Sequence, residues 1–180
     1  MDSLVVIVLA SGRGERFRAS GGQGSKLQAL LGGKPVLQRT LEAVRASGLA
    51  YHVEDAGHEG MGDSIAAGVR ATPAAAGWLV LPGDLPLVRP ESLRSVAAAL
   101  AQWTVVLPYY KDERGHPVGF AASCRDALMA LHGAQGAQQI VKAQVAAGTV
   151  GHIDLDDPGI VTDIDTVQDL ARAEQLLAAI

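Results

Sequence analysis

The sequence predicts an α/β fold, a three-layer αβα sandwich built on a Rossmann-like, mostly parallel sheet. Residues 4–9 form an unbroken apolar, β-branched run, as expected of a parallel strand buried on both faces. A glycine-rich segment, residues 11–24, follows this strand directly. Apolar runs then alternate with segments of helical periodicity along the rest of the chain. A chain of 180 residues with 48% hydrophobic content fits one such unit, and we expect residues 1–180 to form a single domain.

The remaining elements alternate as this fold requires. Pro35 should open a helix whose apolar positions share one face, and residues 78–81 should form a second buried strand ending at Pro82-Gly83-Asp84. Thr166 and Asp169 form a T-x-x-D capping pattern that should begin the last helix. The other predicted strands are residues 49–53, 104–107, 118–121 and 150–155, and the other helices are residues 64–70, 138–147 and one that begins at Pro90.

Charge and composition exclude several classes of function. The formal net charge is −4, and no basic stripe interleaved with aromatic residues suggests extended nucleic acid as a partner. Cys124 is the only cysteine, so an internal disulfide is excluded. The apolar run at residues 4–10 is too short to cross a membrane. We therefore expect a soluble, cytoplasmic protein without a membrane partner.

The segment Leu9-Ala10-Ser11-Gly12-Arg13-Gly14-Glu15-Arg16 is typical of a phosphate-binding loop. Glycines after a strand let backbone N–H groups approach a phosphate closely, and nearby cations supply charge. The dinucleotide fingerprint fails because Phe17 stands at its third glycine, and the Walker pattern fails because Gly24-Ser25-Lys26 reverses the required order. The remaining interpretations are a triphosphate loop with Arg16 and Lys26 as cationic arms, or an ordinary surface turn.

Several motifs together carry a family resemblance. The loop pattern L-A-x-G-x-G-x-R, with Lys26-Leu27 and Gly33-Lys34-Pro35-Val36-Leu37 after it, resembles the opening of the MobA/MocA-like nucleotidyltransferases of molybdenum-cofactor synthesis. Four later segments continue the likeness in order. They are Gly60-Met61-Gly62-Asp63-Ser64, similar to the family's nucleobase segment; Asp84-Leu85-Pro86, similar to its metal-binding D-x-P turn; Gly115-His116-Pro117-Val118, similar to an acceptor-side element of the MocA branch; and Asp163-Ile164-Asp165-Thr166, similar to its closing motif.

The resemblance implies a Mg²⁺-dependent nucleotidyltransferase that moves a nucleoside monophosphate from a nucleoside triphosphate to a phosphorylated small molecule such as molybdopterin. Asp84 would hold the metal with Asp165 or, as the lesser candidate, Asp163, while Arg16 and Lys26 would stabilise the departing pyrophosphate. His116 would contact the acceptor. The residues that would bind the nucleotide are Leu9, Ala10, Ser11, Gly12, Gly14, Gly62 and Ser64.

The residue inventory suits this chemistry. An acceptor phosphate is already an anionic nucleophile, so its attack needs positioning and charge neutralisation rather than a catalytic triad. Ser64 stands in G-D-S-I-A, which is not a nucleophile elbow. The alternatives are a guanylyltransferase, a sugar-phosphate or methylerythritol-phosphate transferase, and a nucleotide-binding module without turnover. The methylerythritol type is disfavoured because Ser25-Lys26-Leu27 stands where P-K-Q is expected.

The identity of the nucleobase and that of the acceptor depend on positions where this sequence departs from the family pattern. Ser11 is closer in size to the alanine of cytidylyl members than to the glycine of guanylyl members, which favours CTP. Residues 48–60 are too few for a strand, a helix and a second strand, so we expect one shortened βα unit. Ala134 and Gln138 replace an Asp and an Arg of the family's acceptor motif, so the acceptor's identity stays open. We expect a monomer or weak homo-oligomer, with transient contact to a molybdoenzyme or chaperone as the further partner class.

Overall fold

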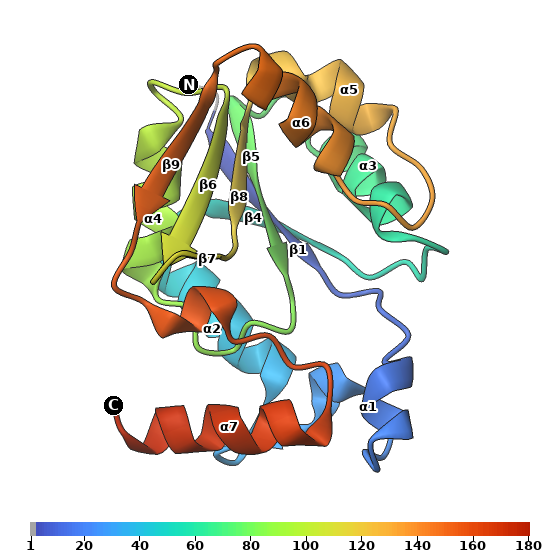
Figure 1. The fold of residues 1–180 in the computed structure, drawn as a ribbon. Helices are drawn as coiled ribbons and strands as arrows, with labels where there is room; N and C mark the ends of the chain where they lie inside the picture. Colours follow the sequence, from blue (N-terminus) through green and yellow to red (C-terminus); the bar gives the residue numbers. More distant parts are fainter. Residues whose placement is uncertain (1–2) are drawn as a thin grey trace.

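The structure, a computed structural model, describes residues 3–180 and confirms the α/β class (Figure 1). Its main sheet has the strand order β4-β1-β5-β8-β6, with β9 and the short β7 paired to β6. Strands β4, β1, β5, β6 and β9 run parallel to one another, while β8 is antiparallel between β5 and β6. The strands are β1 Leu4–Leu9, β4 Ala50–Glu54, β5 Gly77–Pro82, β6 Val105–Tyr110, β7 Glu113–Arg114, β8 Val118–Ala121 and β9 Val150–Asp154.

Helices cover both faces of the sheet because alternate side chains of the central strands are buried on opposite sides. On β1, Val5 and Ile7 pack into one apolar cluster, and Val6 and Val8 pack into the other. The first cluster lies under α3 Met61–Ala71, α5 Arg125–Met129 and α6 Gln138–Ala146. The second lies under α2 Val36–Ser47 and α4 Pro90–Ala99. The predicted three-layer sandwich is thus confirmed.

A third apolar cluster joins segments from the two ends of the described chain. It contains Leu27, Leu31 and Val36 from the N-terminal part and Ile164 and Ala173 from the C-terminal part. These residues come from the 3₁₀ turn Lys26–Gln28, the hairpin of β2 Leu30–Leu31 and β3 Lys34–Pro35, the start of α2, the segment before α7 and α7 Val167–Ala178 itself. In Figure 1, α7 lies below the sheet, on the same side as α1, and the Val167 N–H at its start donates to the Ser20 hydroxyl just after α1.

The predicted long elements are all present, with small shifts of their ends. The helix predicted from Ser64 begins three residues earlier, at Met61. The predicted capping box of Thr166 and Asp169 is confirmed by reciprocal hydrogen bonds. Residues 49–60 contain one strand, β4, which leads directly into α3, as the shortened βα unit requires. A short helix, α1 Glu15–Ala19, forms within the glycine-rich loop and buries Phe17. No helix within residues 3–180 has both the length and the apolar character needed to cross a bilayer.

Candidate active site

The glycine-rich loop and the turn that carries Asp84 meet at the carboxyl ends of β1 and β5. The Gly83 N–H donates to the Leu9 carbonyl at 2.8 Å. A Cβ atom at position 83 would lie 2.9 Å from that same oxygen, so this close approach requires glycine. Parallel strands bring their carboxyl ends to one edge, which explains why loop and turn adjoin.

The backbone of Asp84 is held from two directions. The Thr40 hydroxyl of α2 donates to the Gly83 carbonyl at 2.8 Å, and the Ile164 N–H donates to the Asp84 carbonyl at 3.0 Å. The second bond brings the C-terminal segment, with Asp163 and Asp165, beside the Asp84 turn. Carboxylates about 80 positions apart in sequence thereby share one site.

Lys26 lies between these carboxylates. Its Nζ is 2.8 Å from Asp84 Oδ2 and 3.0 Å from Asp165 Oδ1, and its side chain is only 16% exposed. Arg16 Nη1 reaches Asp165 at 3.5 Å, but its side chain is 80% exposed. The two cations that the sequence predicted are therefore both at the carboxylates, Lys26 as a partly buried bridge and Arg16 as a solvated neighbour.

Burial and charge shift the titration of this group of residues in opposite directions. Burial disfavours the charge of Lys26, but the Asp84 and Asp165 carboxylates outweigh it and raise the lysine pKa, so the bridge is ionic. Burial raises the pKa of Asp84 and the Lys26 charge opposes this rise. Burial, together with the hydrogen bond to Asp165 and the charge of Asp84, raises the pKa of Asp163 to about 6. The pKa of Asp165 is lowered: its hydrogen bond and charge interaction with Lys26 outweigh burial.

The carboxylates suit a divalent cation. Asp84, Asp163 and Asp165 each offer an oxygen within 4.8 Å of the others, and oxygen ligands are those that Mg²⁺ and Mn²⁺ prefer. Asp84 Oδ1 is buried and accepts no hydrogen bond from residues 3–180. An unpaired buried carboxylate oxygen is costly, and a metal ion would satisfy it. Asp163 therefore joins Asp84 and Asp165 as a candidate ligand.

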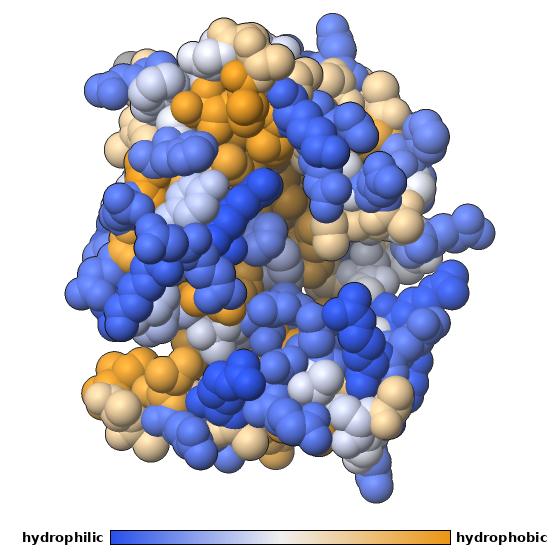
Figure 2. Space-filling view, viewed as in Figure 1, coloured by the Kyte–Doolittle hydropathy of each residue, from blue (hydrophilic) through white to orange (hydrophobic). Residues whose placement is uncertain are grey.

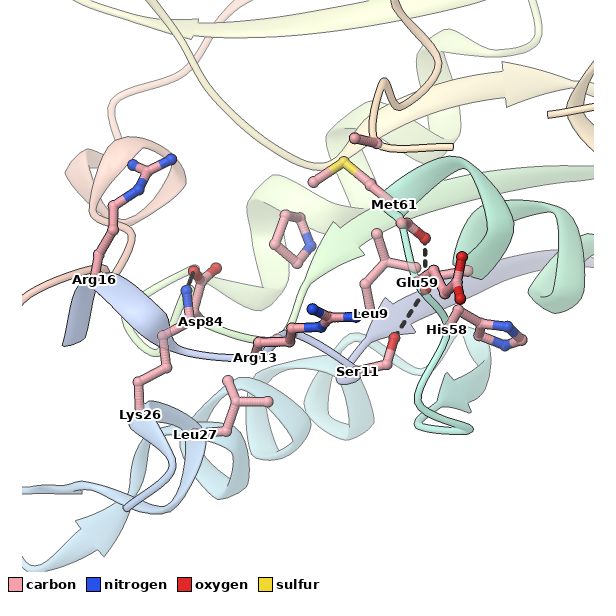
Figure 3. Close-up of a pocket in the computed structure, with 16 residues that line it drawn as sticks. Leu9, Ser11, Arg13, Arg16, Lys26, Leu27, His58, Glu59, Met61 and Asp84 are labelled. Carbon is pink, nitrogen blue, oxygen red and sulfur yellow. Dashed lines mark hydrogen bonds and ion pairs between the residues drawn. The ribbon is translucent and has the colours of Figure 1, made fainter. Parts of the chain in front are cut away.

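A cavity of about 470 Å³, here called the loop cavity, opens beside this cluster (Figure 3). Leu9, Ser11 and Gly12 line it from the loop, and Ser64 lines it from the first turn of α3. The Ser11 and Ser64 hydroxyls lie 2.8 Å apart. In Figure 3 the Lys26 side chain points at Asp84, and Arg13 extends across the cavity toward Leu9. An adjoining cavity of about 390 Å³ is lined by Gly14, Arg16 and Asp165, so the two together offer room for an extended anion.

Two of the predicted nucleotide-binding residues lie elsewhere. Ala10 packs into the third apolar cluster and its N–H donates to the Glu54 carbonyl at 2.9 Å. The Gly62 N–H donates to the Gly133 carbonyl at 2.9 Å, and a Cβ at position 62 would come within 2.8 Å of the His132 carbonyl. Gly62 is therefore a close-packing position between α3 and the segment before α6. Neither residue lines one of the described cavities, and the contacts of both are backbone and packing contacts.

Three residues that line the loop cavity, Arg13, His58 and Glu59, were not predicted as site residues. Met61 and Ala134 also line it; both stood in recognised motifs but were given no binding role. Arg13 stands inside the recognised loop pattern, so its positive charge there could have predicted its place in the site. His58 carried no motif, and its partner Glu54, at 2.9 Å, is brought near by the turn after β4. His116, predicted to contact the acceptor, lines a separate cavity of about 530 Å³, here called the sheet cavity. Met61 lines both the loop cavity and the sheet cavity.

The mostly parallel sheet, the glycine loop and the acidic cluster at its carboxyl edge define an α/β nucleotidyltransferase-type protein. The chain belongs to the family of the MobA-like NTP transferase domain, whose model matches residues 44–148, more than half of the chain. This matched segment includes Asp84 but neither Lys26 nor Asp165. The meeting of these three residues is therefore an observation separate from the family match.

Comparisons with known proteins agree with this family. The bifunctional protein GlmU of Alkalilimnicola ehrlichii is 30% identical over 154 residues, which cover 73% of this chain and 32% of GlmU. The chain thus spans about a third of the length of the curated relatives it matches. The crystal structure of Rv0371c from Mycobacterium tuberculosis H37Rv has a TM-score of 0.78 at 23% identity, covering 97% of this chain and 98% of that one. Its manganese complex has a TM-score of 0.72 at 22% identity, with the same coverage.

A third similar structure is the molybdopterin-guanine dinucleotide biosynthesis protein A of Archaeoglobus fulgidus. It has a TM-score of 0.64 at 20% identity, and the match covers 98% of this chain and 100% of that one. At this identity the likeness concerns the fold alone. The fold, however, is the one expected from the resemblance.

Proposed function

We propose that this protein transfers a nucleoside monophosphate from a nucleoside triphosphate to a phosphorylated small-molecule acceptor. The observation that carries the proposal is the Lys26 bridge between Asp84 and Asp165 at the edge of the loop cavity. Binding a triphosphate with its metal requires a cation, paired carboxylates and a glycine loop, and all three lie at the same edge of the sheet.

The proposed reaction has one bond-forming and one bond-breaking event. An oxygen of the acceptor phosphate attacks the α-phosphorus, the bond from that phosphorus to the bridging oxygen breaks, and pyrophosphate leaves with the electron pair. Ser11, Gly12 and Ser64 would hold the nucleoside end, while Lys26 and Arg16 would turn from the carboxylates toward the leaving phosphates. No proton transfer is needed, because the nucleophile is already anionic.

Asp84 and Asp165, with Asp163 beside them, would hold Mg²⁺. When bound, the ion would neutralise phosphate oxygens and favour in-line geometry. Support comes from the three carboxylates, the unpartnered Asp84 oxygen and the manganese complex of a protein with the same fold.

We further propose CTP as the preferred triphosphate and the molybdenum cofactor as the acceptor. The Ser11 side chain faces Ser64 within the loop cavity and narrows the space beside the loop, which favours a pyrimidine. If the wrong base leaves one buried hydrogen-bonding group unpaired, binding is weaker by about 1–3 kcal/mol, which is enough for a tenfold to hundredfold preference for CTP over GTP. Dissociation constants for CTP and GTP, measured side by side with Mg²⁺, test this assignment. Equal affinities or a preference for GTP would contradict the cytidylyl assignment alone.

Pyrophosphate release tests the enzymatic proposal. CTP and Mg²⁺ are supplied with the molybdenum cofactor, a sugar 1-phosphate or methylerythritol phosphate as separate acceptors. With the active acceptor, Asp84→Asn should lower the rate by about 100-fold or more, since a metal ligand contributes several kcal/mol to transition-state stabilisation. Asp112→Asn, at an exposed position that lines none of the three cavities, is the matched control and should retain full activity. CTP binding without pyrophosphate release from any acceptor would instead indicate a nucleotide-binding module.

A further inference from the structure

The loop cavity lies between two walls that come from different parts of the chain. One wall is the glycine loop with Ser11, and the other is the turn of residues 55–60, from which His58 and Glu59 line the cavity. Figure 2 shows the molecule hollowed between the part with α3 and the part with α1, with mostly hydrophilic side chains on the α1 side. In Figure 3, His58 and Glu59 lie at the end of the cavity away from Arg16. The width of this end depends on how the turn is held.

The turn of residues 55–60 has few contacts of its own. It contains no helix or strand, and its residues are exposed apart from His58 and Gly60, which are half-buried. Within residues 3–180, one hydrogen bond joins residues 55–59 to the rest of the protein, between His58 Nε2 and Glu54 Oε1 at 2.9 Å. A segment with few buried contacts opens at a low free-energy cost. The position of this wall therefore depends on the contact with Glu54.

Glu54 is a buried carboxylate with a histidine at each oxygen. It is 7% exposed, and its Oε2 lies 2.9 Å from His52 Nε2 while its Oε1 contacts His58. Burial acts to raise the pKa of Glu54, but the hydrogen bonds from the two histidines outweigh burial and lower it. The carboxylate is thus ionised near pH 7 and accepts at both oxygens. Glu54 itself does not line the loop cavity, so it can reach a ligand there only through a neighbour.

The backbone of Glu54 holds the opposite wall. Glu54 pairs with Leu9 in the register of β4 and β1, and its carbonyl accepts from the Ala10 N–H at 2.9 Å. Ala10 leads directly into Ser11 of the glycine loop. One residue therefore contacts both walls, the loop through its carbonyl and the turn through its carboxylate. A substitution of the side chain leaves the backbone contact in place, so the contact with the turn can be tested separately.

We propose that Glu54 is a positioning residue of the loop cavity, which acts through His58 to hold the turn of residues 55–60 at the distance from the glycine loop that a nucleoside requires. This inference rests on the proposed function and deepens it by naming a residue that shapes the nucleoside end of the cavity from outside. A nucleotide then meets a preformed wall, and its binding does not have to order the turn. Because His58 lies away from Arg16, the effect should fall on nucleotide binding rather than on the bond-breaking step.

Calorimetry with Mg²⁺ and whichever of CTP and GTP the wild type binds more tightly tests this role. Glu54→Ala should weaken nucleotide binding by about tenfold, because the turn loses its anchor. Glu54→Gln should stay within about threefold of the wild type, since an amide can accept from one imidazole and donate to the other. The matched control is His52→Ala, which removes a bond of the same length to the same carboxylate but lines none of the three cavities. It too should stay within about threefold.

A double-mutant cycle separates anchoring from direct contact, because His58 itself lines the cavity. If Glu54 acts through His58, Glu54→Ala should change nucleotide affinity by less than about twofold in a His58→Ala background. Additive losses would overturn the inference. With the active acceptor, Glu54→Ala should raise the KM for the nucleotide and leave kcat within about twofold, the pattern of lost uniform binding. A fall in kcat with unchanged KM would contradict the positioning role.

A second readout needs no nucleotide. A glutamate-specific protease should cut after the exposed Glu59 about fivefold faster in Glu54→Ala and His58→Ala than in the wild type or His52→Ala, because the released turn opens more often. Cleavage of Glu54→Ala at the wild-type rate would show that the turn is held by other contacts and would refute the inference. Thermal unfolding of each variant verifies that it is folded.

The two proposals fail separately. Nucleotide binding that depends on Glu54, without pyrophosphate release from any acceptor, sinks only the transferase proposal. Pyrophosphate release with the same nucleotide affinity in Glu54→Ala as in the wild type sinks only this one.

Discussion

At the scale of single residues, Lys26 stands where a divalent cation would bind. Its ammonium lies within 3.0 Å of both Asp84 and Asp165 and balances part of the charge of the acidic cluster. A metal ion entering this cluster has to displace the ammonium, which then needs another anionic partner. The triphosphate offers one, so metal and nucleotide should bind with positive cooperativity.

Replacement of Lys26 by methionine should therefore tighten Mn²⁺ binding in the absence of nucleotide, by about tenfold or more, since two carboxylates lose their internal counter-ion. In the same variant, CTP should no longer give the strengthening of Mn²⁺ binding that we expect in the wild type. Isothermal titration with Mn²⁺, with and without CTP, measures both effects. Lys34→Met, which removes only an exposed pair with Glu42, is the control. Unchanged or weaker Mn²⁺ binding by Lys26→Met would contradict the competition.

Single residues of the site differ in how well the sequence predicts them. Lys26, Asp84 and Asp165 could be predicted from the sequence, because each stands in a recognisable motif next to a predicted element. Arg114 and Lys142, which line the sheet cavity, could not: a lone surface cation has no local pattern. They line one cavity because Arg114 ends β7, which pairs with β6, and the chain then passes through His116 into β8 on the side of the sheet that α6 covers. That topology was not predicted from any one segment.

At the scale of elements, the start of α7 and the acidic cluster share hydrogen bonds. The Asp169 carboxylate accepts from the Thr166 N–H at 2.9 Å and also from the Asp165 N–H at 3.0 Å. The cap of the helix therefore fixes the backbone of a candidate metal ligand. Stability of the helix start and geometry of the site depend on the same atoms.

Loss of the cap should lower both the stability of the protein and its affinity for the metal ion. Thr166→Ala should lower the free energy of unfolding by about 1 kcal/mol, because the Asp169 N–H loses its side-chain acceptor. Mn²⁺ affinity should fall as well, by a few-fold, as Asp165 gains freedom. Urea unfolding and Mn²⁺ titration measure the two effects. The control is Gln168→Ala, at the exposed second residue of α7. A variant that loses stability but keeps its Mn²⁺ affinity would separate the cap from the site.

Elements too differ in how well the sequence predicts them. Strand β1 is identified directly by its unbroken apolar run, and helices α2 and α4 are long enough to be identified by their apolar periodicity. Helices α1 and α5 have five residues each, little more than one turn, so periodicity could not identify them. The β2–β3 hairpin was missed for the same reason. Its Leu31 packs into the third apolar cluster, whose C-terminal members come from α7 and from the segment before it.

At the scale of the whole molecule, the site depends on the third apolar cluster. This cluster holds the turn of Lys26 through Leu27 and the segment of Asp165 through Ile164, both neighbours of site residues in the sequence. Ile164 is fully buried. The relative placement of the cation and its carboxylates therefore depends on apolar packing as well as on the ion pair itself.

Ile164→Ala should cost about 2–5 kcal/mol of stability and also weaken CTP and Mn²⁺ binding by about tenfold or more, as the carboxylates lose their fixed position. Leu93→Ala, at an equally buried position in the cluster under α4, should cost a similar amount of stability but leave the affinities unchanged. Urea unfolding and calorimetry compare the two variants. Equal loss of affinity in both would show that the site responds to global stability alone.

The pairing of Lys26 with Asp165 spans 139 positions and has a consequence for the growing chain. At about 5–20 residues per second, a ribosome takes roughly 4–16 s to pass from Asp84 to Asp165. During that interval the nascent chain carries the phosphate loop and the first carboxylate but lacks the second. Nucleotide and metal can then add little to its stability, so the early chain depends on its sheet and helices alone, and the ligands stabilise the protein only once synthesis has passed Asp165.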